Sequence, residues 1–373
     1  MMLVKQKVWL VGLCLLFALG GLLLVNKFKG IHPLTKREIS DGPYIKRLET
    51  DILASWFCGS ELFEKQFANV SLPLAVPNCN YNVVIDRINF NEQSILEFSG
   101  EFDVVASSDF HGQYQILIDL LTSNGVIDQE GHWQFKNGHF VITGDVFDRG
   151  DKVTEILWFL YRLEQEANQA GGKVHLLLGN HEVMVLNGDL RYLHSKYVAV
   201  AELANVPFEQ LYAKGTVLGD WLRAKPVLVK INNMLFTHGG FHPDLAKEKR
   251  SLSEINRVFK TNLVKAELAS PRADFAEYLH KRNGPIWYRG YFKDNGASSA
   301  EIDLLLTHFD VEHLIVGHTS QKQIETRHQG RVIAIDSSIK NGQSGELLFV
   351  SGAEKWRGSM SSEKKPLLIN GSQ

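Results

Sequence analysis

Short apolar runs alternate with helical stretches from about residue 100 onward. In residues 152–170, Ile156, Phe159, Leu160 and Leu163 recur at the i, i+3, i+4, i+7 spacing of a helix that packs on a sheet. Residues 113–121 predict a second helix. Alternating strands and helices are typical of a layered α/β fold, in which β-sheets pack between helices. The apolar runs predict strands at 102–107, 139–143, 173–178, 234–237, 313–316 and 331–335.

The first 25 residues carry a membrane signal. Val8 to Val25 form a stretch of 18 residues without a charge. As a helix this stretch would be roughly 27 Å long, close to the ~30 Å thickness of a bilayer core. We expect an uncleaved signal-anchor that spans the membrane once, with a cleaved signal peptide as the alternative and a buried core helix as a third interpretation. Lysines flank the stretch on both sides, so the positive-inside rule does not place the rest of the chain.

Two further segments lie outside the predicted α/β body, which spans residues 100–350. Residues 26–99 contain several prolines and no clear periodicity, and they predict an amino-terminal extension, while residues 351–373 predict a loosely ordered polar tail. Cys58 and Cys79 would form a disulfide in an oxidising compartment, worth roughly 3 kcal/mol by chain entropy, or would remain two unrelated thiols. We expect the body to be periplasmic, either anchored or secreted after signal cleavage.

Composition excludes several classes of protein. The 373 residues include 40 Lys and Arg against 42 Asp and Glu, and 44% are hydrophobic. Balanced charge provides no positive field that would recruit a nucleic acid, so we expect no nucleic-acid partner. The hydrophobic content excludes global disorder, and three cysteines exclude a thiolate metal cluster.

Residues with metal-binding side chains follow five of the predicted strands, each beside a glycine. Because the carboxyl ends of strands in α/β sheets form one crevice, we expect these side chains to converge. Oxygen and imidazole donors without thiolate suit Mn, Fe or Zn. Six donors are too many for one open catalytic ion, so they predict two divalent ions that share a carboxylate and a bridging water. The six residues are Asp109, His111, Asp145, Asn180, His238 and His318.

Such a pair of ions favours hydrolysis of a phosphate ester by direct attack of the bridging water. Arg149 offers a planar set of donors that matches phosphate oxygens. His181 is a candidate general acid for the leaving oxygen, and Asp148 could hydrogen-bond its imidazole and keep it protonated.

The sequences SDFHGQ, GDVFDRG, LLGNHE, HGG and VGHT, in this order, resemble the five motifs of the calcineurin-like metallophosphoesterases, and specifically of the phosphoprotein phosphatase family. The longer run from Gly144 to Tyr192 is similar to the Shewanella-like protein phosphatases, a branch that prefers phosphotyrosine. The resemblance implies a metallophosphoesterase fold with the metal site at the carboxyl ends of the strands.

The resemblance also implies a role for each matching residue. A first ion would be held by Asp109, His111 and Asp145. The shared Asp145, together with Asn180, His238 and His318, would hold the second. Asp148 and His181 would form the acid pair, and Asn180 and Arg149 would contact phosphate.

Three positions depart from the family pattern. Ser108 replaces the first glycine of GDxHG, which a small residue should tolerate, and Leu178 replaces the arginine that precedes GNHE in the eukaryotic Ser/Thr enzymes. A second phosphate-binding arginine has no secure counterpart, and Arg289 is our candidate. Beside it, Trp287 and Tyr288 would either stack an aromatic leaving group or belong to the core.

We therefore expect a membrane-anchored, metal-dependent phosphomonoester hydrolase whose partner is a phosphoprotein or a small phosphoester. Phosphotyrosine is the expected substrate, with phosphoserine and phosphothreonine also open. The alternative is a phosphodiesterase or nucleotide pyrophosphohydrolase that uses the same site. A non-catalytic binding scaffold is a third hypothesis, which an intact set of ligands disfavours.

Overall fold

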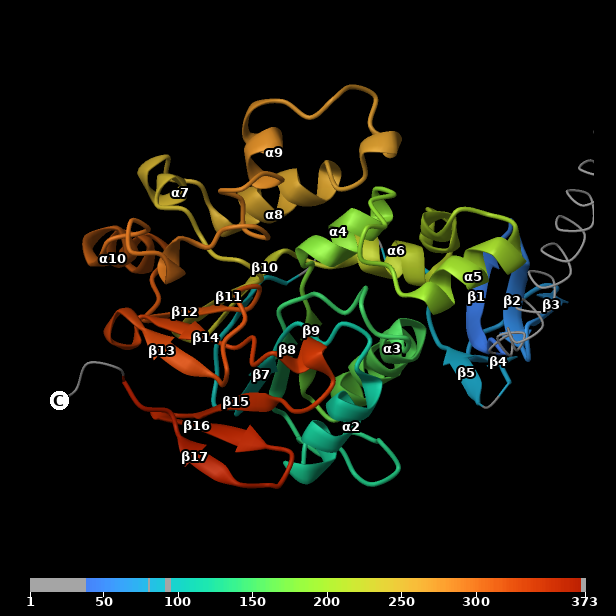
Figure 1. The fold of residues 1–373 in the computed structure, drawn as a ribbon, viewed down its shortest axis with the longest axis horizontal. Coiled ribbons are helices and arrows are strands. Elements are labelled where there is room, and N and C mark those ends of the chain that lie inside the picture. Colours follow the sequence, from blue (N-terminus) through green and yellow to red (C-terminus); the bar gives the residue numbers. More distant parts are fainter. Residues whose placement is uncertain (1–37, 80, 91–94, 370–373) are drawn as a thin grey trace, which may run out of the picture. The chain divides into compact units, whose positions relative to one another are not determined.

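Two six-stranded sheets form the centre of the fold in the computed structural model (Figure 1). The first sheet has the strand order β13-β14-β12-β11-β10-β6 and the second has the order β17-β16-β15-β7-β8-β9. The strands of the first sheet are β6 (Glu97–Phe98), β10 (Leu228–Ile231), β11 (Met234–Thr237), β12 (His313–Val316), β13 (Glu325–Arg327) and β14 (Val332–Ala334). Those of the second are β7 (Val104–Ser107), β8 (His139–Ile142), β9 (Lys173–Leu176), β15 (Glu346–Ser351), β16 (Glu354–Ser359) and β17 (Lys364–Pro366).

The structure describes residues 38–369, apart from residues 80 and 91–94. All statements below concern the larger of two units, Ser40–Gln373. The predicted membrane segment, residues 1–25, lies outside the described residues. Among the residues that are described, no helix has the length and apolar character needed to cross a membrane.

The inner faces of the two sheets share one hydrophobic core. Val104 and Ala106 of β7 belong to the same buried cluster as Phe236 of β11 and Ile315 of β12. Because side chains alternate along a strand, every second residue of these strands enters this core. The predicted layered α/β fold is confirmed, with two sheets packed face to face.

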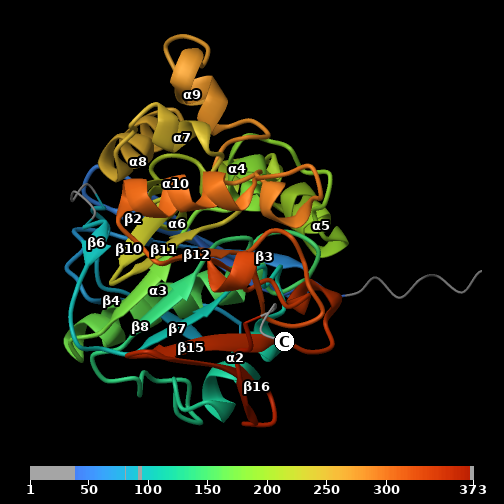
Figure 2. The same cartoon turned by 90° about the vertical axis from the view of Figure 1, so that its left-hand side faces the viewer.

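Helices cover the outer faces of the sheets. Helix α3 packs against β9, and its predicted apolar stripe is buried. Helices α7, α8 and α9 lie together at one end of the unit in both views (Figures 1 and 2). The described α-helices are α2 (Tyr114–Ser123), α3 (Val153–Gln169), α4 (Asn180–Leu186), α5 (Ser195–Ala204), α6 (Val217–Ala224), α7 (Asp244–Lys247), α8 (Leu252–Thr261), α9 (Asp274–Leu279) and α10 (Ser299–Phe309). Short 3-10 turns are η1 (Phe208–Tyr212), η2 (Lys265–Glu267), η3 (Gly290–Phe292), η4 (His328–Gly330) and η5 (Ile339–Asn341).

The five strands that precede the candidate site residues belong to both sheets. Strands β7, β8 and β9 are parallel neighbours in the second sheet, and β11 and β12 are parallel neighbours in the first. Hydrogen bonds join the carboxyl ends across the two sheets, because the amide of His318 donates to Asp109 and His238 contacts the carbonyl of Thr143. The candidate site residues therefore converge, as expected, where the carboxyl ends of strands from the two sheets meet.

The segments on either side of the α/β body contain strands. The extension holds a three-stranded sheet, β1 (Asp41–Arg47), β2 (Ile52–Cys58) and β3 (Glu61–Phe67), and the pair β4 (Leu74–Pro77) and β5 (Asn82–Ile85). Cys58 and Cys79 form a disulfide, so the pairing considered from the sequence is confirmed. The segment 351–373, predicted to be a loosely ordered tail, instead contains β16 and β17, which complete the second sheet by pairing outward from β15.

Candidate active site

The turns that carry the candidate site residues have an unusual backbone. Asp109, His111, Asp145, Asp148, Arg149 and His318 all adopt left-handed conformations, with φ between 45° and 72°. Such conformations cost non-glycine residues free energy and persist where the surroundings hold them in place, which occurs often at functional sites.

Glu182 is the side chain that holds two of these turns together. Its carboxylate accepts hydrogen bonds from the amides of Asp145, Val146 and Phe147, at 2.8, 2.7 and 3.2 Å, and from the amide of Gly179 at 2.7 Å. Glu182 follows His181 directly, but its sequence context does not reveal this role. Glu182 is fully buried and fixes the turn after β8 against the start of α4.

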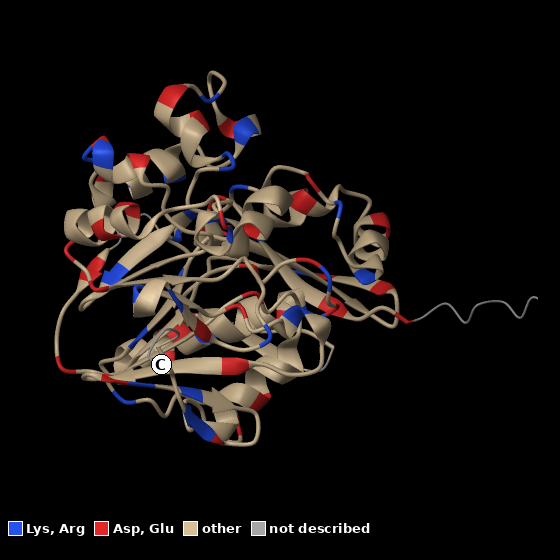
Figure 3. Cartoon of the chain, turned by 60° about the vertical axis from the view of Figure 1, so that its left-hand side comes forward, with Lys and Arg blue, Asp and Glu red and all other residues tan. Residues whose placement is uncertain are grey.

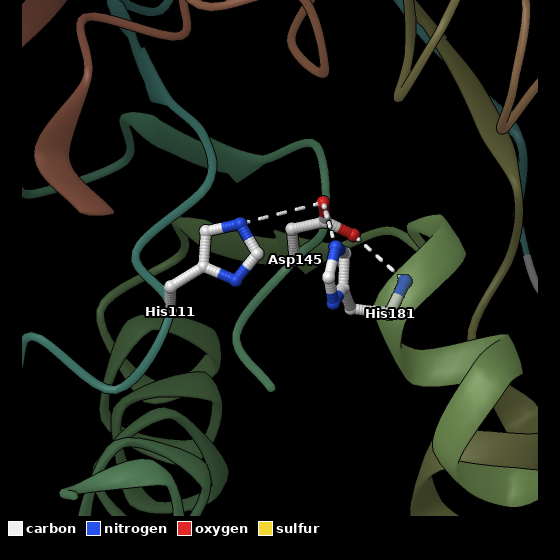
Figure 4. Close-up of side chains that lie close together, drawn as sticks. All are labelled: His111, Asp145 and His181. Carbon is white, nitrogen blue, oxygen red and sulfur yellow. Dashed lines mark hydrogen bonds and ion pairs between the residues drawn. The ribbon is translucent and has the colours of Figure 1, made fainter. Parts of the chain in front are cut away.

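The carboxylate of Asp145 lies at the centre of the site. Its Oδ2 atom is 3.6 Å from Nε2 of His111 and 3.8 Å from Nε2 of His181, and its Oδ1 accepts a hydrogen bond from the amide of His181 at 3.0 Å. Figure 4 shows these three side chains around the carboxylate. The donor atoms of His111, Asp145 and His181 all lie within 4.8 Å of one another, a spacing that could hold a metal ion.

A second group of donors approaches the same Oδ2 atom of Asp145. Nε2 of His238 lies 3.2 Å from Oδ2 of Asp145, 3.0 Å from Oδ1 of Asn180 and 3.1 Å from Nδ1 of His318. The donor atoms of Asp145, His238 and His318 also lie within 4.8 Å of one another. Asp145 is therefore common to both groups, the position expected for a carboxylate shared by two ions.

Asp109 lies next to both groups but belongs to neither. Its Oδ1 is 3.9 Å from Nε2 of His111, while its Oδ2 accepts hydrogen bonds from the amide of His318 at 2.9 Å and from the hydroxyl of Ser108 at 2.5 Å. Ser108, which replaces the family glycine, thus supports the carboxylate. Burial, and after it the nearby charge of Asp336, raise the pKa of Asp109 well above its usual value.

The outer nitrogens of two histidines are fixed by backbone carbonyls. Nδ1 of His111 lies 2.7 Å from the carbonyl of Phe147, and Nδ1 of His238 lies 3.0 Å from that of Thr143. An N–H at each Nδ1 leaves the lone pair of Nε2 directed at Asp145, which is the tautomer of a metal-ligating histidine.

Several lone pairs converge around Nε2 of His238, and a positive charge at this point would stabilise them. Around Nε2 of His238 lie a carboxylate oxygen, an amide oxygen and a second imidazole nitrogen. Burial disfavours the charged form of His238, but the carboxylates, that of Asp145 foremost, outweigh burial and raise its pKa to about 9. A bound cation would satisfy the same lone pairs by displacing this proton, so the donor set fits divalent metal ions.

His181 and Asp148 form the buried pair that the sequence predicted. Nδ1 of His181 lies 2.5 Å from Oδ2 of Asp148, which leaves Nε2 facing Asp145 and the donor groups. Burial alone would lower the pKa of His181, but the charges of Asp145 and Asp148 and the hydrogen bond to Asp148 raise it above its usual value. The pair therefore favours a protonated imidazole that can donate toward the site.

Arg149 and Arg289, the two candidates for phosphate binding, lie next to residues of the site. The guanidinium of Arg149 lies over the ring of Tyr192 at 5.0 Å, and the amide of Arg149 donates to the carbonyl of Tyr192 at 3.0 Å. Nη1 of Arg289 donates to the carbonyl of His318 at 2.6 Å. Tyr192 also lies 5.3 Å from the His181 ring, so it contacts both the acid pair and Arg149, a role that the sequence did not reveal.

Comparison with known proteins identifies the class of this site. Residues 102–322 match the family described as calcineurin-like phosphoesterase. The chain belongs to this family. Its members use divalent metals to hydrolyse phosphate esters, and the two donor groups around Asp145 are consistent with that chemistry. The protein is a metal-dependent phosphatase with a metallophosphoesterase fold.

Three individual proteins show the similarity in detail. The crystal structure of a cold-active protein-tyrosine phosphatase from a psychrophilic Shewanella species superimposes with a TM-score of 0.82 and 40% identity, over 88% of this chain and 99% of that one. Shewanella-like protein phosphatase 1 of Plasmodium berghei is 31% identical over 255 residues, 64% of this chain and 68% of the relative. Shewanella-like protein phosphatase 2 of Arabidopsis thaliana is 40% identical over 111 residues, 30% of this chain and 28% of the relative.

Proposed function

We propose that this protein is a dinuclear protein phosphatase that acts on phosphotyrosine. The observation that carries the proposal is the position of Asp145, whose carboxylate belongs to both groups of candidate metal ligands. One ion would be held by His111 and Asp145 of the first group together with Asp109, whose Oδ1 lies 3.9 Å from Nε2 of His111, while His181 of that group would act as the proton donor. The other ion would be held by Asp145, Asn180, His238 and His318. The hard oxygen and imidazole donors favour Mn, Fe or Zn.

Bound divalent ions would lower the pKa of a water molecule and offset charge on the phosphoryl group. Residues of this chain would bind the phosphoryl group and protonate the leaving group. Arg149, Asn180 and Arg289 would bind the phosphoryl oxygens and orient the ester for in-line displacement. His181, kept protonated by Asp148, would donate its proton to the leaving oxygen of the tyrosine.

The choice of phosphotyrosine is supported by the Shewanella protein-tyrosine phosphatase, which shares 40% identity with this chain. The test compares kcat/KM on phosphotyrosine, phosphoserine and phosphothreonine peptides with that on a phosphodiester and a dinucleoside tetraphosphate. We expect the phosphotyrosine peptides to be hydrolysed most efficiently. Faster cleavage of the diester or the nucleotide would contradict the proposal and favour the alternative with the same metal site.

We further propose that residues 1–25 anchor the protein in a membrane and that its body lies in the periplasm. The uncharged stretch Val8 to Val25 supports an anchor, and the Cys58–Cys79 disulfide favours an oxidising compartment. Fractionation of cells combined with protease treatment of intact spheroplasts tests this proposal. Recovery of the whole protein in the soluble cytoplasmic fraction would contradict it.

A further inference from the structure

A cavity of about 1030 Å³ opens beside the candidate active site. Its lining runs from the end of α9 through the loop that precedes α10, and His242 and Pro243 complete the wall. Figures 1 and 2 show α9 and α10, which flank this loop, above the sheet that contains β11 and β12. The volume is at the upper end of the range usual for ligand-binding pockets.

The cavity is continuous with the catalytic residues through Trp287 and Arg289. Both line the cavity, and both contact His318, since the Trp287 ring lies 5.8 Å from the His318 ring and Arg289 donates to the His318 carbonyl. The turn after β11 holds this wall in place. The amide of Gly239 donates to the carbonyl of Pro285 at 2.6 Å, and a side chain at Gly239 would collide with the backbone of Trp287.

Cationic side chains dominate the lining. The lining contains one carboxylate, that of Glu301, and four cationic side chains, which are those of Lys281, Arg282, Arg289 and Lys293. Lys281 is paired with Glu277, which lies outside the lining, and Glu301 with Lys247. The other lining group with an acidic partner is His242, which contacts Asp244 at 3.0 Å. Within the described part of the chain, the charged groups of Arg282 and Lys293 have neither an ion-pair nor a hydrogen-bond partner.

Two buried polar atoms of lining residues also have no partner. The hydroxyl of Tyr278 and Nε2 of His280 form no hydrogen bond with any residue that the structure describes. Nδ1 of His280 lies 2.9 Å from the carbonyl of Ala276, and burial lowers the His280 pKa to about 4, so Nε2 is an acceptor at neutral pH. These two atoms are buried beneath the cavity wall, and the unpaired cations Arg282 and Lys293 are the lining groups that favour an anionic ligand.

We propose that this cavity binds an acidic segment of the phosphoprotein substrate, adjacent to the phosphorylated residue. This inference rests on the proposed function. The phosphate of the substrate must lie at the metal site so that the substrate peptide can continue past Arg289 into the cavity. Carboxylates of the segment pair with Arg282 and Lys293. The charge of the lining is complementary to that of an acidic peptide.

The test measures kcat/KM of the full-length, metal-loaded protein on phosphotyrosine peptides that carry Asp and Glu, or Lys and Arg, on either side of the phosphotyrosine. The variant is the double substitution Arg282→Glu and Lys293→Glu. We expect the wild type to prefer the acidic peptides, and the variant to lose about ten-fold in kcat/KM on them while p-nitrophenyl phosphate is hydrolysed at an unchanged rate. The preference should also weaken at 0.5 M salt, because screened surface charges interact less.

The control exchanges two exposed cations that do not line the cavity, Lys136→Glu and Lys214→Glu, so that net charge changes equally. This control should retain the preference for acidic peptides. Equal loss in the control and the variant, or no preference in the wild type, would overturn the inference while phosphatase activity remains. Failure of the wild type to hydrolyse any phosphomonoester would instead contradict the proposed function itself.

Discussion

At the scale of the residue, the chemistry depends on neighbours that raise or lower the basicity of each group. His181 is buried, and burial alone would remove its proton, but two carboxylates reverse that effect. His111, which has a similar environment without a carboxylate partner on its Nδ1, has a pKa that burial lowers to about 3. Adjacent imidazoles are thus prepared for opposite roles, one as a proton donor and the other as a neutral ligand.

Replacing Asp148 with Asn should change the pH dependence of catalysis. His181 acts as an acid only when protonated, so the rate falls as pH rises through its pKa. Removal of the Asp148 charge lowers that pKa, and the alkaline limb of the kcat profile should therefore move to lower pH. Profiles of wild type and variant on phosphotyrosine peptide measure the shift, and a limb that stays in place would show that Asp148 does not control the acid.

Replacing His181 with Asn should separate substrates by their leaving groups. Phenyl phosphate needs protonation of its leaving oxygen, and we expect its kcat to fall by roughly 10²–10⁴-fold. p-Nitrophenyl phosphate has a stable leaving group, so its loss should be much smaller. Equal losses on the two substrates would remove His181 from the role of general acid.

At the scale of the element, part of the strand and helix pattern was predictable because apolar periodicity reflects burial, but the buried strands β10 and β15 and the helices α4 to α10 were not predicted. The strands β7, β8, β9, β11 and β12 all begin and end within two residues of the predicted ranges. The division of these strands between two sheets was not predictable, because a buried strand has the same apolar pattern in either sheet. The strands β16 and β17 were missed since β16 is half-exposed and β17 lies exposed at the sheet edge, and their sequence has no apolar run.

Changing Glu182 to Gln should destabilise both the turn after β8 and the start of α4. The amide nitrogen of Gln would face backbone N–H groups that now donate to a carboxylate oxygen, leaving buried donors unpaired. We expect a loss of about 2–3 kcal/mol in the free energy of unfolding, measured by urea titration, together with a large fall in kcat. Glu130→Gln, at an exposed position, is the control, and equal stability of the two variants would refute the anchoring role.

At the scale of the whole molecule, charge is spread in both signs rather than gathered into one field. Figure 3 shows Lys and Arg interspersed with Asp and Glu along the ribbon. The overall balance of charge was predictable from composition, but the local excess of cations around the cavity was not. That excess depends on which side chains already have partners, and only the folded chain determines those pairs.

Buried neutral histidines outside the site should make the fold sensitive to acid. Burial lowers the pKa of His139 and of His280 to about 4. The unfolded chain therefore binds more protons between about pH 6.5 and 4, so the stability that these groups contribute is present above pH 6.5 and lost as pH falls through 4. The stability lost in acid through His280 is on the order of 3 kcal/mol.

The variant His280→Gln tests this prediction by urea unfolding at pH 7 and pH 4.5. The loss of stability between the two pH values should be smaller in the variant than in the wild type. An identical pH dependence of wild type and His280→Gln would contradict the assignment.

The account as a whole depends on one carboxylate that two groups of ligands share. Metal content per chain, measured by elemental analysis on wild type and on Asp145→Asn, tests it most directly. We predict about two divalent ions in the wild type, and loss of both ions together with a fall in activity of more than roughly 10³-fold in the variant. An Asp145→Asn protein that keeps two ions and hydrolyses phosphotyrosine at the wild-type rate would contradict the account.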